Sequence, residues 1–173
     1  MELLDGEDME RLIERGGALA SHAAVDLLLP VCAAIAYAHA KGVVHRDLKP
    51  ANVFLVQSND GPHAKVLDYG IAKLKHATSE GGDPAHPAGV TTTGQLLGTP
   101  RYLSPEQARG SLSVDERADV YAAGVMLFEM LAGRPPFDGH NAFQLIWKHG
   151  NEPAPPLTDH APHVPRELAD VVA

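Results

Sequence analysis

Eight consecutive residues, His45 to Asn52, constrain the fold of this chain more than any other feature. They read HRDLKPAN, and the tripeptide Asp68-Tyr69-Gly70 follows after two short apolar runs. These segments supply a carboxylate suited to acid–base work, a cation two residues further on, and an amide and a second carboxylate whose oxygens suit a hard metal ion. The fold must therefore bring one loop and the end of a later strand to the same place.

The apolar spacing predicts an α+β fold that is predominantly α-helical. Short β-hairpin strands are expected at Val53–Val56 and Ala64–Leu67, and a strand-like pair at Val43-Val44. Helices are expected at Glu7–Arg15, from an N-cap at Ser21 to a stop at Gly42, at 117–132, at 141–148 with Asn141 as cap, and from Arg166 onward. The HRDLKPAN loop thus lies between a helix and a hairpin. A mobile loop is expected at 76–89.

In the second of these helices, apolar residues at helical spacing predict one buried face. That face comprises Val25, Leu28, Leu29, Cys32, Ile35, Ala36 and His39. The single cysteine, Cys32, is accordingly expected to be a buried small hydrophobe in a reducing compartment.

Composition excludes several classes of function. The 173 residues fit one domain, and the formal net charge of −8 argues against nucleic acid or an anionic membrane as the main partner. The apolar stretch Leu27–Ala40 is shorter than the roughly 20 residues that a bilayer requires, so no membrane segment is expected in this chain. The expected location is cytoplasmic, although a longer parent protein could carry an anchor. His160 and His163 lack the partners of a zinc site.

Every residue of the pattern H-R-D-L-x-x-x-N is present, so the chain resembles the eukaryotic-like bacterial Ser/Thr protein kinases. Residues 98–107 resemble the segment that docks the acceptor residue, and residues 119–125 resemble the central helix of the large lobe. The wording of residues 127–137 is typical of bacterial members. The resemblance implies a protein-kinase-like large lobe, with ATP and Mg²⁺ as cofactors and proteins with Ser/Thr acceptors as partners.

The resemblance assigns catalytic roles to four residues. Asp47 would accept the proton of a substrate hydroxyl, and Lys49 would offset charge on the transferring phosphoryl group. Asn52 and Asp68 would be the metal ligands. Tyr69 stands where Phe is commoner, and Gly70 lets the backbone bend sharply beside Asp68.

Other positions are assigned to substrate binding and regulation. Thr99 would contact Asp47 and Lys49, and Glu106 would pair with an arginine further along the family's chain. Arg46, beside the catalytic carboxylate, is a ready partner for a phosphate on the activation loop. The candidate acceptors of that phosphate are Thr91, Thr92 and Thr93.

The first eight residues resemble the hinge between the two kinase lobes, with Met1 at the gatekeeper position. The backbone of Glu2 and Leu4 would face the adenine edge, Asp8 the ribose, and Phe54 the floor beneath the base. An ordinary acidic N-terminus is the alternative. The resemblance makes the HRDLKPAN segment, residues 45–52, the catalytic loop, and this name is used for it below. His45 and Asp119 are expected to be structural, with Asp119 hydrogen-bonded to the backbone of the catalytic loop or interacting with a helix dipole.

Residues 1–173 are therefore expected to be one partial kinase domain, from the hinge to the penultimate helix region, with the small lobe absent. No glycine-rich phosphate loop or V-A-I-K lysine is found in the sequence. Two functions follow: the catalytic lobe of a Ser/Thr protein kinase, inactive as an isolated fragment, or a catalytically silent module that docks protein partners. The four intact catalytic positions favour the first.

Overall fold

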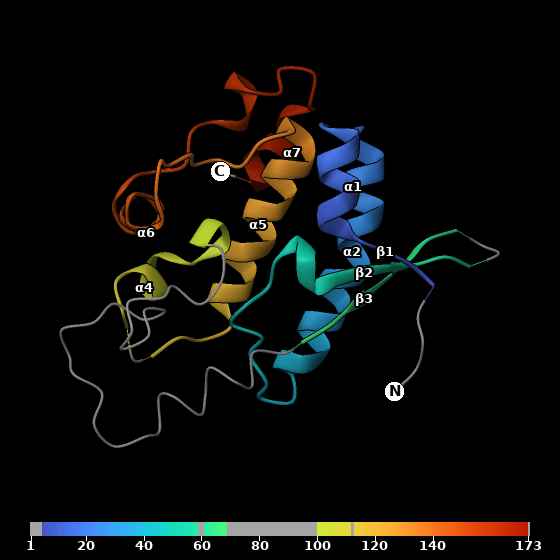
Figure 1. Cartoon of the computed structure of the whole chain (residues 1–173), viewed down its shortest axis with the longest axis horizontal. Helices are drawn as coiled ribbons and strands as arrows, with labels where there is room; N and C mark the ends of the chain where they lie inside the picture. Colours follow the sequence, from blue (N-terminus) through green and yellow to red (C-terminus); the bar gives the residue numbers. More distant parts are fainter. Residues whose placement is uncertain (1–4, 59–60, 69–99, 112, 173) are drawn as a thin grey trace.

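Two long helices form the centre of the molecule (Figure 1). The computed structural model describes residues 5–58, 61–68, 100–111 and 113–172, so the loop expected at 76–89 lies outside the described residues. Helix α2 (Ser21–His39) packs along α5 (Arg117–Ala132). The other helices are α1 (Met9–Gly16), α4 (Pro105–Ala108), α6 (Ala142–Asn151) and α7 (Arg166–Val171). Short 3-10 turns are η1 (Pro50–Asn52), η2 (Pro100–Tyr102) and η3 (Leu157–Asp159).

A three-stranded antiparallel sheet lies against α2 and connects the HRDLKPAN loop to Asp68. Its strands are β1 (Gly6–Asp8), β2 (Val53–Val56) and β3 (His63–Val66), in the order β1-β2-β3. Strand β2 begins directly after Asn52, and β3 ends two residues before Asp68. The Leu67 amide donates to the Asn52 carbonyl at 2.8 Å, beyond the end of the hairpin ladder. The hairpin thereby brings the two expected metal-binding segments together.

The core is built around α5, which is buried on most of its sides. Its Met126, Phe128, Met130 and Leu131 are almost wholly buried, and Met9 of α1 joins the same cluster. Helix α5 has the predicted bounds and ends at Gly133, which takes the left-handed conformation with φ 70°. A side chain at Gly133 would meet the Ala18 backbone nitrogen at 2.8 Å, so only glycine fits this helix end.

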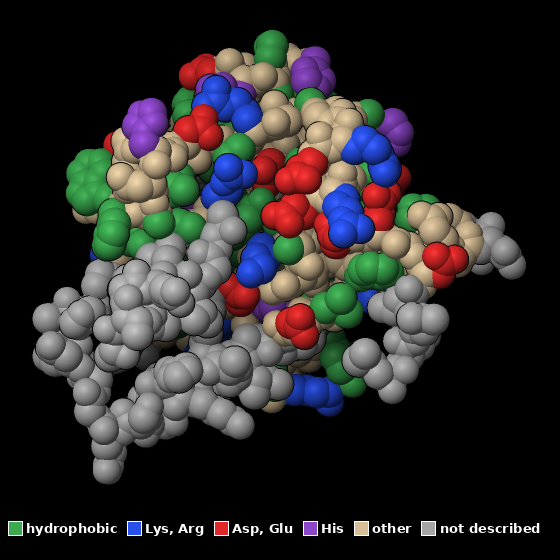
Figure 2. All heavy atoms as spheres, in the orientation of Figure 1, with side chains coloured by type: hydrophobic (Ala, Val, Ile, Leu, Met, Phe, Trp, Pro, Cys, Tyr) green, Lys and Arg blue, Asp and Glu red, His purple; other side chains and the backbone are tan. Residues whose placement is uncertain are grey.

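The other helix and strand boundaries follow local capping chemistry. Helix α6 has the predicted cap, in which the Asn141 side chain accepts a hydrogen bond from the Gln144 amide, and it runs three residues further than expected. Helix α1 begins at Met9 because the Asp8 carboxylate accepts from the Arg11 amide at 2.9 Å. Figure 2 shows acidic and basic side chains interspersed over α1, where Arg15 forms two hydrogen bonds to Glu7.

Two local predictions are wrong. Ser21 is not the N-cap of α2: Ala20 holds that position, and no side chain caps the helix. Val43-Val44 does not form a strand, because the chain leaves the helix through a turn at Gly42 and goes directly into the catalytic loop. By contrast, β2 has the predicted bounds, and β3 differs by one residue at each end.

The predicted buried face of α2 is also wrong for part of its length. The buried residues are Ala24, Leu28, Val31, Ile35 and Ala38, whereas Leu29 and Cys32 are exposed. This helix is apolar on nearly every side, so its periodicity does not distinguish the face that meets the core. Leu29 and Cys32 instead border an open apolar groove of about 200 Å³ between α2, α5 and α7.

Helix α2 is also longer than the apolar stretch Leu27–Ala40, whose shortness was the reason to expect no membrane segment. Within the part of the chain that the structure describes, it is the one helix whose length and composition would allow it to cross a membrane. The core helix of a folded domain meets the same criterion, and α2 packs along β3 and α5.

A buried histidine joins α6 to α5. The side chain of His149 is 2% exposed, and its Nδ1 lies 2.8 Å from the hydroxyl of Tyr121. Its ring also packs edge-on against Phe137, with the centroids 4.9 Å apart. Burial lowers the pKa of His149 from 6.5 to about 4. A hydrogen bond with the backbone of Arg101 raises the pKa and offsets only part of this effect. The folded protein therefore holds this imidazole neutral.

We predict that His149 makes the folded state less stable in acid. Between pH 6.5 and about 4 the unfolded chain binds a proton at this side chain that the folded chain does not, so the free energy of unfolding falls as pH falls through this window. The loss amounts to about 3 kcal/mol at most. Urea unfolding from pH 7 to pH 4 should give a flatter pH dependence for His149→Gln than for the wild type. The exposed His22, changed to Gln, is the control and should leave the slope unchanged; equal slopes in all three proteins would contradict the prediction.

Candidate functional site

One buried carboxylate holds the catalytic loop in place. Asp119, 1% exposed on the first turn of α5, accepts hydrogen bonds from the backbone amides of His45 and Arg46, each at 2.8 Å. The two bonds that the resemblance implied for Asp119 are therefore present. A buried carboxylate requires such donors to compensate for lost hydration.

The third partner of Asp119 was missed by sequence reasoning. His39, at the end of α2, places Nε2 2.7 Å from the Asp119 carboxylate. By periodicity alone, His39 is only one member of an apolar helix face. The signal that could have revealed this contact is that His39 is a polar residue on an otherwise apolar face, shortly before the HRDLKPAN loop begins. His39 connects α2 to the loop through Asp119.

The backbone of the site is strained at two of the predicted residues. Within the described residues, only Arg46 and Asp68 among non-glycine residues have positive φ, at 63° and 51°. Such conformations cost free energy and persist where surrounding contacts enforce them. Both outliers lie beside predicted functional side chains, Arg46 preceding Asp47 and Asp68 being itself a predicted metal ligand.

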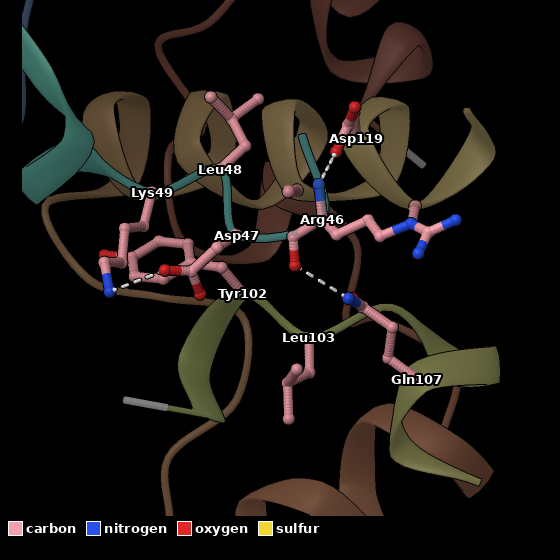
Figure 3. Close-up of a pocket in the computed structure, with 10 residues that line it drawn as sticks. Arg46, Asp47, Leu48, Lys49, Tyr102, Leu103, Gln107 and Asp119 are labelled. Carbon is pink, nitrogen blue, oxygen red and sulfur yellow. Dashed lines mark hydrogen bonds and ion pairs between the residues drawn. The ribbon is translucent and has the colours of Figure 1, made fainter. Parts of the chain in front are cut away.

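The catalytic-loop side chains converge on one point. Lys49 Nζ lies 3.1 Å from Asp47 Oδ2, and the Asn52 amide nitrogen lies 2.8 Å from the Asp47 carbonyl and 3.3 Å from Oδ2. Figure 3 shows the carboxylate of Asp47 and the ammonium of Lys49 pointing toward each other. Because the Asn52 nitrogen faces Asp47, the amide oxygen is the atom that can face a cation.

His45 joins this loop to the segment that ends in Asp68. Its ring is fully buried; Nδ1 accepts from the Asp47 amide at 3.3 Å, and Nε2 lies 3.0 Å from the Leu67 carbonyl. A carbonyl can only accept, so Nε2 carries the proton. The imidazole therefore bridges the two motif segments.

A second segment, η2 and α4, lies against the loop. The hydroxyl of Tyr102 donates to the buried Glu129 carboxylate of α5 at 2.5 Å, and burial raises the pKa of both groups. Ser104 is fully buried and caps α4 together with Gln107. The segment that resembles the acceptor-docking region is thus fixed to the core helix.

One side-chain polar atom of the loop and one of α4 have no hydrogen-bond partner among the described residues. They are Nε of Arg46 and Oε1 of Glu106, both buried. The Arg46 guanidinium makes one hydrogen bond at 3.3 Å, from Nη2 to the Val114 carbonyl.

The remaining predicted site residues divide into two groups. Asp8 and Phe54 are brought together as register partners in the β1–β2 pair, and the Asp8 carboxylate caps α1 and contacts Arg11 at 3.3 Å. The others lie outside the described residues: Met1, Glu2, Leu4, Tyr69, Gly70, Thr91, Thr92, Thr93 and Thr99. Among the described residues, no cluster of three or more His, Cys, Asp or Glu side chains could hold a metal.

A loop carboxylate flanked by a lysine and an asparagine defines a site suited to phosphoryl transfer. The sequence matches the family described as the protein kinase domain over residues 1–170. The chain belongs to this family.

Bacterial Ser/Thr protein kinases are among its relatives, as the sequence analysis predicted. The chain is 43% identical over 173 residues to Ser/Thr-protein kinase Pkn1 of Myxococcus xanthus, covering 99% of this chain and 23% of that protein. It is 39% identical over 172 residues to the probable Ser/Thr-protein kinase PknB of Lactococcus lactis, covering 99% of this chain and 25% of that protein. The chain therefore spans about a quarter of the length of these curated relatives.

We predict that Asp119→Asn destabilises the fold by about 2–3 kcal/mol. The NH₂ group of the asparagine would replace one carboxylate oxygen, so one of the two backbone amides, of His45 or Arg46, would face a donor and lose its acceptor. Urea unfolding followed by circular dichroism measures the change. The control is Asp115→Asn, an exposed carboxylate just before α5, which should shift the free energy of unfolding by less than about 0.5 kcal/mol. Equal unfolding midpoints for both variants would contradict the anchoring role of Asp119.

Proposed function

We propose that this chain is the large lobe of a Mg-ATP-dependent protein kinase that phosphorylates serine and threonine hydroxyls of proteins. The observation that carries the proposal is the arrangement of Asp47, Lys49 and Asn52 on one anchored loop. Family membership and the names of the bacterial relatives support it. A module that only binds partners has no need of all three side chains.

The chemistry assigned to the loop is positioning and charge compensation. The Asp47 carboxylate would orient the acceptor hydroxyl and take up its proton as the oxygen–phosphorus bond forms. Lys49, already 3.1 Å from that carboxylate, would offset negative charge on the phosphoryl oxygens. The Ser/Thr preference is inferred from Lys49, because tyrosine-specific relatives word this part of the loop differently.

The donor set fits magnesium. The Asn52 amide oxygen and the Asp68 carboxylate are hard oxygen ligands, and Mg²⁺ commonly takes only one or two ligands from protein. When bound, the metal would neutralise phosphate charge. The hydrogen bond from the Asn52 amide nitrogen to the Asp47 carbonyl would aim its amide oxygen.

We predict that Asp47→Asn, made in the full-length protein, lowers transfer of the ATP γ-phosphate to a protein substrate by about 100-fold to 10,000-fold. Affinity for ATP should stay within about twofold, since Asp47 is assigned to the acceptor hydroxyl. The control is Asp138→Asn, an exposed carboxylate paired with Arg134 away from the loop, which should leave the rate unchanged. Wild-type protein that binds peptide but transfers no phosphate would instead support a silent docking module.

Arg46 is proposed to bind a phosphate on the activation loop. Its buried Nε has no partner among the described residues, and a phosphate would supply a charge-assisted acceptor. The candidate phosphothreonines remain Thr91, Thr92 and Thr93, which lie outside the described residues.

We predict that Arg46→Gln lowers the activity of the phosphorylated full-length protein about tenfold or more, with a smaller effect after phosphatase treatment. Phosphopeptide mapping by mass spectrometry should find phosphate on at least one of the three threonines. An active protein in which all three are unmodified would refute the proposed regulation.

A further inference from the structure

The side chain of Gln107 joins the start of α4 to the catalytic loop. Its Nε2 donates to the Arg46 carbonyl at 2.8 Å, while its Oε1 accepts from the Ser104 amide at 3.0 Å (Figure 3 shows the first of these bonds). The Gln107 amide in turn donates to Ser104 Oγ at 3.4 Å, which completes a capping box. One carboxamide therefore serves both as part of a helix cap and as a contact to the catalytic loop.

The partners of this carboxamide fix its orientation. A backbone N–H can only donate and a backbone carbonyl can only accept, so Oε1 must face Ser104 and Nε2 must face Arg46. A glutamate would keep the cap but lose the donor. A lysine would supply a donor but lose the acceptor. Glutamine has the length and the mixed polarity that both bonds require.

The bond to Arg46 acts on the peptide unit that carries Asp47. The Arg46 carbonyl belongs to the Arg46–Asp47 peptide, and the nitrogen of the same peptide donates to His45 Nδ1. On the other side of Arg46, the preceding peptide nitrogen is held by Asp119. The strained φ of 63° at Arg46 is thus enclosed between a bond from α5 and a bond from α4.

We propose that Gln107 is a positioning residue for the phosphoryl-transfer reaction: its carboxamide sets the orientation of the Arg46–Asp47 peptide, and so of the Asp47 carboxylate, according to how the segment 100–107 is seated. This rests on the proposed function. The side chain of Gln107 couples the segment that resembles the acceptor-docking region to the loop that bears the catalytic carboxylate.

The space around the bond from Gln107 to the Arg46 carbonyl decides which substitution of Gln107 tests it. The cavity lined by Arg46, Asp47, Tyr102 and Gln107 measures about 10 Å³, close to the volume that one water needs. A truncation to alanine would let water replace the lost donor. Gln107→Glu is isosteric and keeps the acceptor for Ser104, but its ionised carboxylate cannot donate to the Arg46 carbonyl.

The chain offers a matched control. Gln144 occupies the same position in the cap of α6, where Oε1 accepts from the His140 amide at 2.9 Å and the Gln144 amide donates to Asn141. Among the described residues it makes no recorded contact with the catalytic loop. Gln144→Glu therefore makes the same chemical change at the matching position of another helix cap, where the side chain accepts from the residue before the N-cap.

The test uses the full-length protein with each variant. Gln107→Glu should lower kcat about 10-fold to 100-fold, with KM for ATP within about twofold, because the reacting carboxylate is misplaced. As pH falls, the new carboxyl takes up a proton and regains a donor, so the deficit in kcat relative to wild type should shrink. Gln144→Glu should show neither effect.

A second readout needs no activity. In nuclear magnetic resonance spectra recorded without ATP, the Asp47 amide should shift in Gln107→Glu and stay in place in Gln144→Glu. If the wild type has no kinase activity but the Asp47 amide still shifts in Gln107→Glu, the proposed function is refuted and the structural coupling of Gln107 to Asp47 stands. An unshifted Asp47 amide, or a kcat and pH profile equal to those of the control, would overturn the inference. Gln107→Leu, which removes both bonds without adding charge, serves the same comparison if Gln107→Glu does not fold.

Discussion

The carboxylate of Asp119 is the interaction on which the rest of the site depends. It lies almost wholly buried and accepts from two successive backbone amides of the catalytic loop, while His39 approaches from α2. The end of α2, the loop that follows it and the distant helix α5 meet at this one group. A backbone turn with positive φ is unfavourable by itself, so the loop keeps its shape only because these contacts enforce it.

Where local chemistry dominates, the sequence predicted the structure well. Helix α5 and strand β2 have the expected bounds, and Asn141 caps α6 as expected, because caps, glycine stops and apolar runs act over a few residues. The face of α2 was mispredicted because a helix that is apolar all round carries no directional signal, and only its partners decide which side is buried. For the same reason, the sequence could not show that Cys32 borders the open groove.

The same difference between local sequence patterns and contacts with distant residues applies to the candidate site. Motif spacing singled out Asp47, Lys49 and Asn52, and the family resemblance singled out Asp119, because each belongs to a short, recognisable pattern; the structure brings all four to one loop, while their catalytic roles stay a prediction. Motif spacing did not predict His39 or Gln107, whose partners lie 80 and 61 residues away in the chain. Neither residue stands out by type, because a histidine on a helix or a glutamine in a cap is ordinary until the fold supplies a distant carboxylate or carbonyl.

The burial of Glu129, the partner of Tyr102, has a consequence for how the stability of the protein depends on pH. Burial raises the pKa of Glu129, so the folded chain holds a proton there more readily than the unfolded chain, and this group favours folding as pH falls. His149, whose pKa burial lowers, acts in the opposite direction. The two linkages oppose each other in mildly acidic solution. The wild type therefore loses less stability in acid than His149 alone would cause, because protonation of Glu129 in α5 offsets part of the effect of His149 in α6.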